Sequence, residues 1–104
     1  MPKLKKPETV KPRLDRLIPL GRTAMTRGVA DLVESENLDL LPYFARHASC
    51  DWGDICAEDW QSNNHAVEHG HRLLSVYKLS DTQAFWIITE WDRSVTTALL
   101  PSEY

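Results

Sequence analysis

Long hydrophobic segments are missing from this sequence. No apolar run approaches the roughly 20 residues that a transmembrane helix needs. Residues 1–6, Met-Pro-Lys-Leu-Lys-Lys, are basic, but no apolar segment follows them, so we predict no secretory signal peptide. These two absences lead us to expect a cytoplasmic protein that has no membrane partner.

Cysteine is scarce as well, since Cys50 and Cys56 are the only two in 104 residues. In a reducing cytoplasm both stay thiols, and we expect them to be small buried side chains. The fold therefore has to be held by a hydrophobic core. A chain of this length has room for one such core and one domain.

Large apolar side chains are few in residues 1–16, where Pro2, Pro7 and Pro12 are interspersed with lysines. Such a segment cannot bury enough surface to offset its conformational entropy. We therefore predict a disordered basic tail over residues 1–16 and a single domain over residues 17–104.

Charge is distributed unevenly along the chain. Residues 1–16 carry six basic and two acidic side chains, a formal charge of +4, whereas residues 17–104 carry six basic and thirteen acidic ones, a formal charge of −7. An acidic body repels a phosphate backbone. We expect nucleic acid to approach the tail only, and the body to suit a protein partner.

Hydrophobic periodicity predicts helices first and strands afterwards. Helices are expected over residues 26–35, 39–48 and 57–69, and strands over 72–79, 84–90 and 95–100, with 17–20 as an edge strand or an extended lead-in. Short connections between the last three strands imply antiparallel pairing. The predicted fold is α+β, with two or three helices packed on a three- or four-stranded antiparallel β-meander. An exposed sheet edge next to Val95–Leu100 would allow a homodimer.

Local signals predict where the helices begin and end. Thr26 can cap the first helix, and Asp54 can cap the third, which Gly70 can end. Asn64 falls on the inner face of the third helix together with Trp60. A buried amide must be hydrogen-bonded, and we expect its partner in the preceding loop.

Several short motifs carry a resemblance to a known family. They are Asp51-Trp52-Gly53-Asp54, Glu58-Asp59, Asn63, Arg72-Leu73-Leu74-Ser75, Tyr77, Trp86-Ile87-Ile88-Thr89-Glu90, Asp92-Arg93-Ser94, Thr96-Thr97 and Leu99-Leu100-Pro101-Ser102-Glu103-Tyr104. With them the chain, from about Leu20 onward, resembles an uncharacterised family of small "plasmid-related" proteins of bacterial plasmids and mobile elements. The resemblance implies plasmid maintenance, transfer or antagonism of host defence, and selects none of these. Trp91 departs from the pattern, because we expect a small residue there, and so does the histidine-rich end of the third helix.

Two polar corners are the candidate partner-binding surface. The first is the loop with Asp51, Trp52 and Asp54, and the second is the connection with Glu90, Trp91, Asp92 and Arg93. A large ring in a tight connection is suited to anchor a partner. If the two corners meet, the carboxylates of Asp51, Asp54 and Glu90 could instead hold a divalent cation. Turn stabilisation is the structural alternative for all of these aspartates.

The third helix also contains an H-x-x-E-H pattern, which is typical of inverted zinc metallopeptidases. His65 and His69 share one side of a helix and could bind zinc, with Glu68 as base. The pattern lies at a helix end, however, and the remaining strands leave no room for a peptidase cleft. His47, Cys50, Cys56 and a later histidine could form a mixed metal site, but the spacing between the two cysteines departs from that of structural zinc ligands. We therefore assign no metal, no cofactor and no catalytic residue.

Three functions remain as hypotheses. The first is a non-enzymatic protein-interaction module encoded by a mobile element, which antagonises or modulates a host nucleic-acid-handling or defence protein. Its acidic surface would imitate a phosphate backbone. The second is a small metal-dependent hydrolase, and the third is a nucleic-acid accessory protein that binds through its basic tail. Bound metal, or salt-sensitive binding of nucleic acid, would distinguish the second and third from the first.

Overall fold

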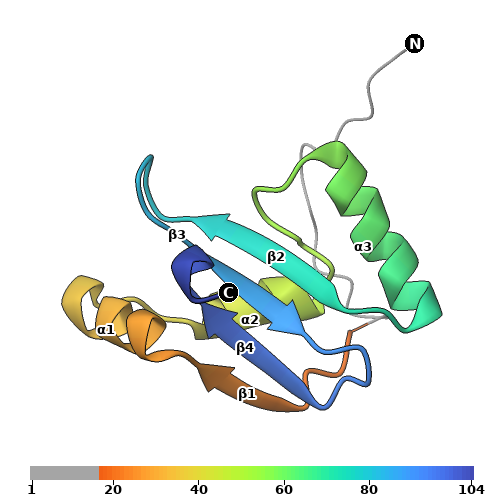
Figure 1. Ribbon diagram of the computed structural model, residues 1–104, viewed down its shortest axis with the longest axis horizontal. Coiled ribbons are helices and arrows are strands. Elements are labelled where there is room, and N and C mark those ends of the chain that lie inside the picture. The colour runs from red at the N-terminus through yellow and green to blue at the C-terminus, as the bar shows by residue number, and fades with distance from the viewer. Residues whose placement is uncertain (1–16) are drawn as a thin grey trace.

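A computed structural model describes residues 17–104, and the predicted disordered tail lies outside the described residues. Four strands and three α-helices follow one another in the chain, with a short 3₁₀ turn after them (Figure 1). Their bounds are β1 (Arg22–Met25), α1 (Arg27–Glu36), α2 (Leu41–Ala48), α3 (Ala57–His69), β2 (Leu73–Lys78), β3 (Ala84–Thr89), β4 (Val95–Leu99) and η1 (Pro101–Glu103). The α+β class is confirmed. In the same residues, no helix is long and apolar enough to cross a membrane.

The sheet is mixed, which corrects the predicted antiparallel meander. Its strand order is β1-β4-β3-β2. Strands β2, β3 and β4 form the expected antiparallel meander, but β1 pairs with β4 in parallel, with Arg22 opposite Val95 and Met25 opposite Ala98. The prediction failed because β1 shows neither alternation nor a β-branched run. Residues 17–20 are the extended lead-in, in which the N–H of Ile18 donates to the carbonyl of Ala48 at 2.9 Å.

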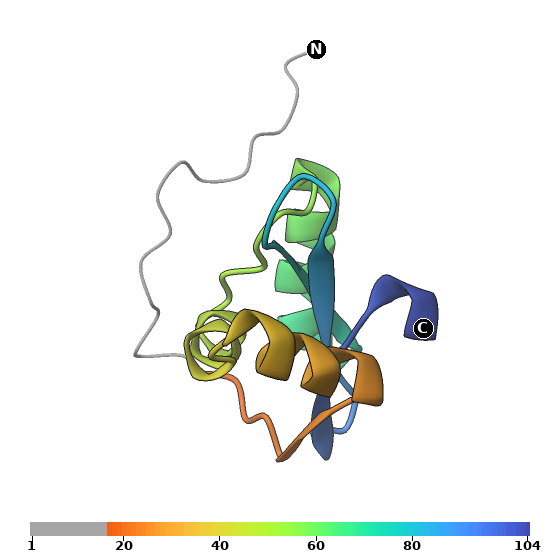
Figure 2. The same cartoon turned by 90° about the vertical axis from the view of Figure 1, so that its left-hand side faces the viewer.

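The sheet separates two different environments. Helix α2 lies on one side of the sheet and the C-terminal turn on the opposite side, while α1 runs across the end of the sheet toward α2 (Figure 2). On the helix side, Tyr43 of α2 packs against Tyr77 and Phe85, with ring centroids 5.2 and 5.0 Å apart. On the other side, Tyr104 packs against Trp86 at 5.3 Å.

The helix ends follow the sequence signals with one exception. The Thr26 hydroxyl accepts a hydrogen bond from the N–H of Val29 and begins α1, as predicted. Gly70, with a φ of 69°, ends α3 in the left-handed region, also as predicted. The predicted cap of α3 was wrong, because the Sγ of Cys56 takes that place and the Asp54 carboxylate binds β2 instead.

Helix α3 lies beside β2, and its buried face agrees with the prediction at Trp60 but differs from it at Asn64. Trp60, Asn63 and Ala66 are buried, whereas Asn64 is exposed. The predicted contact of Asn64 with the preceding loop is nevertheless confirmed, since its Oδ1 accepts from Trp52 Nε1 at 2.9 Å. Side chains of α3 and of the loop thus build one core cluster around Trp52, while α1, α2 and the sheet build a second.

Candidate functional site

The connection between β3 and β4 presents Trp91 to solvent, with 67% of its surface exposed. The turn closes through a bond from the N–H of Arg93 to the carbonyl of Glu90, at 2.9 Å. The Asp92 carboxylate accepts bonds from the hydroxyl and the N–H of Ser94, at 2.6 and 3.1 Å. These bonds lower the pKa of Asp92, so the turn carries a carboxylate beside an exposed indole.

Arg93 fixes this turn to the end of helix α3. Its backbone is left-handed, with a φ of 61°. Its guanidinium donates to the carbonyls of His71 at 2.6 Å, Ala66 at 3.2 Å and Glu90 at 3.2 Å. The pKa of Arg93 is lowered by partial burial. Because its donors are used within the chain, Arg93 positions Trp91 and is not itself a free contact.

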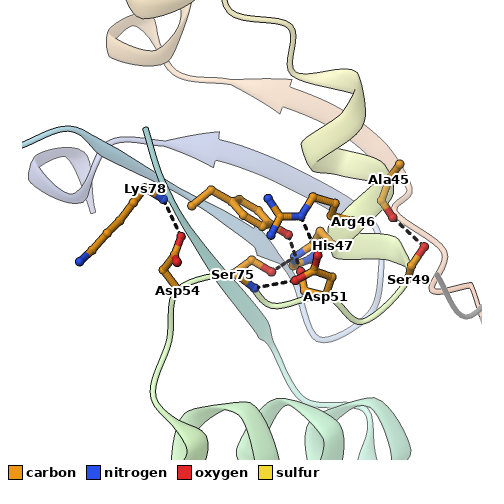
Figure 3. A network of polar contacts seen from close by, with 10 residues as sticks. Ala45, Arg46, His47, Ser49, Asp51, Asp54, Ser75 and Lys78 are labelled. Carbon is orange, nitrogen blue, oxygen red and sulfur yellow. Dashed lines mark hydrogen bonds and ion pairs between the residues drawn. The ribbon is translucent and has the colours of Figure 1, made fainter. Parts of the chain in front are cut away.

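The second predicted corner, residues 51–54, lies beside α2 and β2, where Asp51 points toward Arg46 and Asp54 toward Lys78 (Figure 3). The Arg46 Nε donates to Asp51 Oδ2 at 2.6 Å, and this pairing raises the pKa of Arg46. The same guanidinium lies 4.7 Å from the centre of the Tyr77 ring. The Tyr77 hydroxyl in turn donates to the Asp51 carbonyl at 2.7 Å. Asp51 is therefore engaged in a structural network that joins α2, the loop and β2.

Residues 52–54 run along β2 as an additional strand-like segment. The N–H of Val76 donates to the Trp52 carbonyl at 3.2 Å, and the N–H of Asp54 donates to the Val76 carbonyl at 2.6 Å. The approach requires glycine between them, because Gly53 has a φ of 77° and a Cβ there would lie 2.1 Å from the Val76 carbonyl oxygen. The Asp54 carboxylate then accepts from the N–H of Lys78 at 2.9 Å.

These contacts change the interpretation of the loop. Trp52 has no exposed surface, so its ring belongs to the core and cannot reach a partner in this fold. Asp51 and Asp54 hold the loop against α2 and β2. The structural alternative for these aspartates is therefore the one that the geometry supports.

The two corners do not meet. Leu73, at the start of β2, pairs with Thr89, which directly precedes Glu90, whereas Asp54 binds Lys78 at the other end of the strand. Five residues of extended strand separate the two positions by roughly 17 Å. The carboxylates of Asp51, Asp54 and Glu90 therefore do not converge on one cation.

A buried polar chain lies under the sheet and was not predicted. His47 is fully buried, with Nδ1 2.6 Å from the Ser75 hydroxyl and Nε2 2.8 Å from the Thr89 hydroxyl. Thr89 and Thr96 are 2.7 Å apart, and the Thr96 hydroxyl donates to the Leu20 carbonyl at 2.7 Å. These hydrogen bonds connect helix α2, all three strands of the meander and the lead-in before β1.

The Leu20 carbonyl, at the end of this hydrogen-bonded series, determines which group donates in each of its hydrogen bonds. A carbonyl oxygen only accepts, so Thr96 spends its proton on Leu20 and must accept from Thr89. Thr89 then accepts from Nε2–H of His47, which leaves Nδ1 as the acceptor for the Ser75 hydroxyl. Burial, and secondarily the charge of Arg93, lowers the pKa of His47 to about 3. The imidazole is therefore neutral at physiological pH and has no nitrogen free for catalysis or metal binding.

The histidines at the end of α3 gather on the surface with geometry that does not suit a metal. The rings of His65 and His69 stack at 3.9 Å with an angle of 18°, and His71 lies 6.0 Å from His65. His69 Nδ1 donates to the His65 carbonyl at 2.9 Å, so that nitrogen is not a ligand. Across residues 17–104, no group of three or more His, Cys, Asp or Glu side chains is arranged to hold a metal ion.

The mixed histidine and cysteine set does not assemble either. Cys50 is buried, as expected for a small thiol, but Cys56 is exposed and caps α3. His47 spends both ring nitrogens on hydroxyls. His47 and the two cysteines therefore do not form a metal site.

The sequence does contain a signal for this buried series of hydrogen bonds, although we did not predict it. Ser75, Thr89 and Thr96 each occupy a helix-facing position of their strand, where an apolar residue is the usual choice. Three hydroxyls on one buried face need a shared partner. His47 follows Tyr43 by four residues on the inner face of α2, and its two ring nitrogens can bond two hydroxyls at once.

Comparisons with protein-family models, with curated proteins and with solved structures find no match to this chain.

Proposed function

We propose that the chain is a non-enzymatic protein-interaction module whose main contact is Trp91. The observation that carries this proposal is a large aromatic side chain, 67% exposed, on a turn that internal hydrogen bonds already hold in shape. An anchor that is ordered before binding loses little conformational entropy when a partner covers it. Tryptophan is also among the side chains most enriched in binding hot spots.

The chemistry around Trp91 favours a partner with basic groups around an apolar pocket. Asp92 keeps its charge because Ser94 holds it, and Glu90 is half-buried beside the turn. Residues 17–104 carry a formal charge of −7. Such a surface attracts proteins that themselves bind phosphate backbones. We therefore propose a host nucleic-acid-handling or defence protein as the partner, in keeping with the resemblance to proteins of mobile elements.

The experiment compares two exposed aromatic residues. Wild type, Trp91→Ala and Tyr104→Ala are immobilised, and proteins retained from a plasmid-bearing bacterial extract are quantified and then re-bound in purified form. Tyr104 is the matched control, since it is 68% exposed and packs against Trp86 of β3, outside the β3–β4 connection. We expect Trp91→Ala to weaken binding of the purified partner by more than about tenfold, as hot-spot truncation does.

Unchanged melting temperature of Trp91→Ala would show that the loss lies in contact and not in folding. Equal binding by wild type and Trp91→Ala would contradict the proposal. A hydrolase is not favoured by any observation, because the described carboxylates and histidines are spread over separate sites.

A further inference from the structure

The two edge strands of the sheet differ in whether their outward backbone groups are hydrogen-bonded. Along β2, the backbone N–H and carbonyl groups that point away from β3 belong to Leu74, Val76 and Lys78. The Asn63 side chain bonds both the N–H and the carbonyl of Leu74, at 3.2 and 2.7 Å. Residues 52–54 bond the N–H and the carbonyl of Val76, and the Asp54 carboxylate accepts from the N–H of Lys78. This edge is closed to further pairing.

The opposite edge, strand β1, is open (Figure 1). The N–H groups of Arg22 and Thr26 donate to the carbonyls of Ser94, just before β4, and Ala98, within β4, at 3.0 Å each. Backbone groups alternate in direction along a strand. Those of Thr23 and Met25 therefore point outward, and nothing within residues 17–104 bonds them. Neither proline nor lysine, the usual protections of an edge, occurs in β1.

An apolar groove of about 460 Å³ runs beside this open edge. Leu20, Met25, Leu40 and Phe44 are among the residues that line it, and Asp39 is its one charged lining residue. Leu41 at its rim is 75% exposed, and Met25 is 51% exposed. An unprotected strand and an apolar groove lie together, which is the combination that strand addition uses.

We propose that a second copy of the chain covers this edge, through antiparallel pairing of β1 with β1 of the partner. A twofold axis at Ala24 places Thr23 opposite Met25 of the other copy, so both outward-pointing residues form hydrogen-bonded pairs. Ala24 then lies opposite Ala24 of the other copy in a close, non-hydrogen-bonded pair, and its small side chain fits there. Met25 of each copy reaches the rim of the other copy's groove.

Charge complementarity selects a second copy over an unrelated peptide. In this register Arg22 lies opposite Thr26 of the other copy, on the same face of the sheet. The Thr26 hydroxyl donates to Glu103 at 2.5 Å, and the N–H of Gly28 donates to the same carboxylate at 3.0 Å, which lowers the pKa of Glu103. Arg22 is exposed and makes no ion pair within residues 17–104. Two symmetric Arg22–Glu103 pairs would therefore close the interface.

The first test measures mass and amide exchange on full-length protein. Light scattering from micromolar to near-millimolar concentration should show a shift from 11.9 kDa to twice that mass. In the dimer the amides of Thr23 and Met25 should exchange more slowly than in the monomer, because only those β1 amides point outward. Monomeric protein throughout the range, or a dimer with unprotected Thr23 and Met25, would overturn the proposal.

The second test exchanges charges. Arg22→Glu brings two carboxylates together across each half of the interface and should weaken dimerisation on the order of tenfold or more. Adding Glu103→Arg in the same chain should restore it. Lys78→Glu makes the same change of charge on the closed edge and should leave the dimer intact. A dimer unaffected by Arg22→Glu would refute the register.

Glu103 also accepts hydrogen bonds from Thr26 and from the N–H of Leu100 in its own chain, so Glu103→Arg removes contacts that stabilise the fold. Thr23→Pro provides an independent check, because proline there removes only an outward N–H and is tolerated on an edge strand. We expect a folded monomer with an unchanged circular dichroism spectrum. A folded dimer of Thr23→Pro would count against pairing through β1. Trp91 lies outside this interface, so the dimer and the proposed function are tested by different variants.

Discussion

At the scale of single residues, His47 shows how a polar group can belong to a core. Its two nitrogens hold hydroxyls from separate strands, with the direction of each bond set by the Leu20 carbonyl. Such a chain is fully satisfied only when the imidazole is neutral. A second proton on Nδ1 would meet the Ser75 hydroxyl, which is already donating. The fold therefore depends on the protonation state of one residue.

This dependence predicts a loss of stability in mild acid. The pKa of His47 is about 3 in the folded protein and near its ordinary 6.5 when unfolded. The unfolded state thus binds the extra proton between these values, so stability is complete above pH 6.5 and decreases as the pH falls toward 3. At about 1.4 kcal/mol per pH unit, folding should lose about 2 kcal/mol between pH 6.5 and pH 5.

Urea unfolding of wild type and His47→Gln at several pH values isolates this residue. Glutamine does not titrate, so the variant is expected to be less stable at neutral pH but to show a flatter pH profile. Carboxylates titrate in both proteins and cancel in the comparison. Parallel pH profiles would show that His47 is not the group responsible.

At the scale of elements, helix α3 and the loop before it act together as the closure of β2. The Asn63 amide imitates a neighbouring strand, because it both donates to and accepts from the Leu74 backbone. The next residue, Asn64, only accepts, from the Trp52 indole. Asn63 therefore needs both its amide N–H and its amide oxygen, whereas Asn64 needs only its oxygen.

Replacing each with aspartate tests this difference. Asn63→Asp loses the donor to the Leu74 carbonyl and places a carboxylate beside it, which should cost about 1–3 kcal/mol of unfolding free energy. Asn64→Asp keeps the acceptor for Trp52 and should change stability by less than about 0.5 kcal/mol. Chemical denaturation of both variants gives the two values. Equal destabilisation would show that α3 is not attached to β2 through Asn63.

The same elements show what sequence patterns can and cannot predict. Helix ends and the meander were predicted because caps such as Thr26 and Gly70 act within one turn. The parallel strand β1 was missed because its position depends on distant contacts, including the approach of Gly21 to the Ser94 carbonyl, where a Cβ would lie at 2.3 Å. The tight connection around Trp91 was predicted from local turn residues. Its attachment to α3 through Arg93 was not, since no local rule specifies a contact with Ala66.

At the scale of the whole molecule, the chain divides into two parts of opposite charge, which suit different kinds of partner. The described body has a formal charge of −7 and the first sixteen residues have +4. A chain of this kind can approach a phosphate backbone only through its basic segment, because the body is repelled. The protein contacts that we propose at Trp91 and at β1 involve the body alone. The two kinds of binding should therefore be separable by substitution.

Changing Lys3, Lys5, Lys6 and Lys11 to glutamine lowers the formal net charge of residues 1–16 from +4 to zero and leaves the described residues unchanged. We expect full-length wild type to bind DNA weakly at low ionic strength, with log affinity falling by about 0.9 per phosphate contacted for each tenfold rise in salt. The glutamine variant should not bind, whereas Arg72→Gln, a control on the body, should behave as wild type. Fluorescence anisotropy with labelled duplex DNA measures all three. DNA binding that survives in the glutamine variant would mean that the acidic body itself contacts nucleic acid, against its electrostatics.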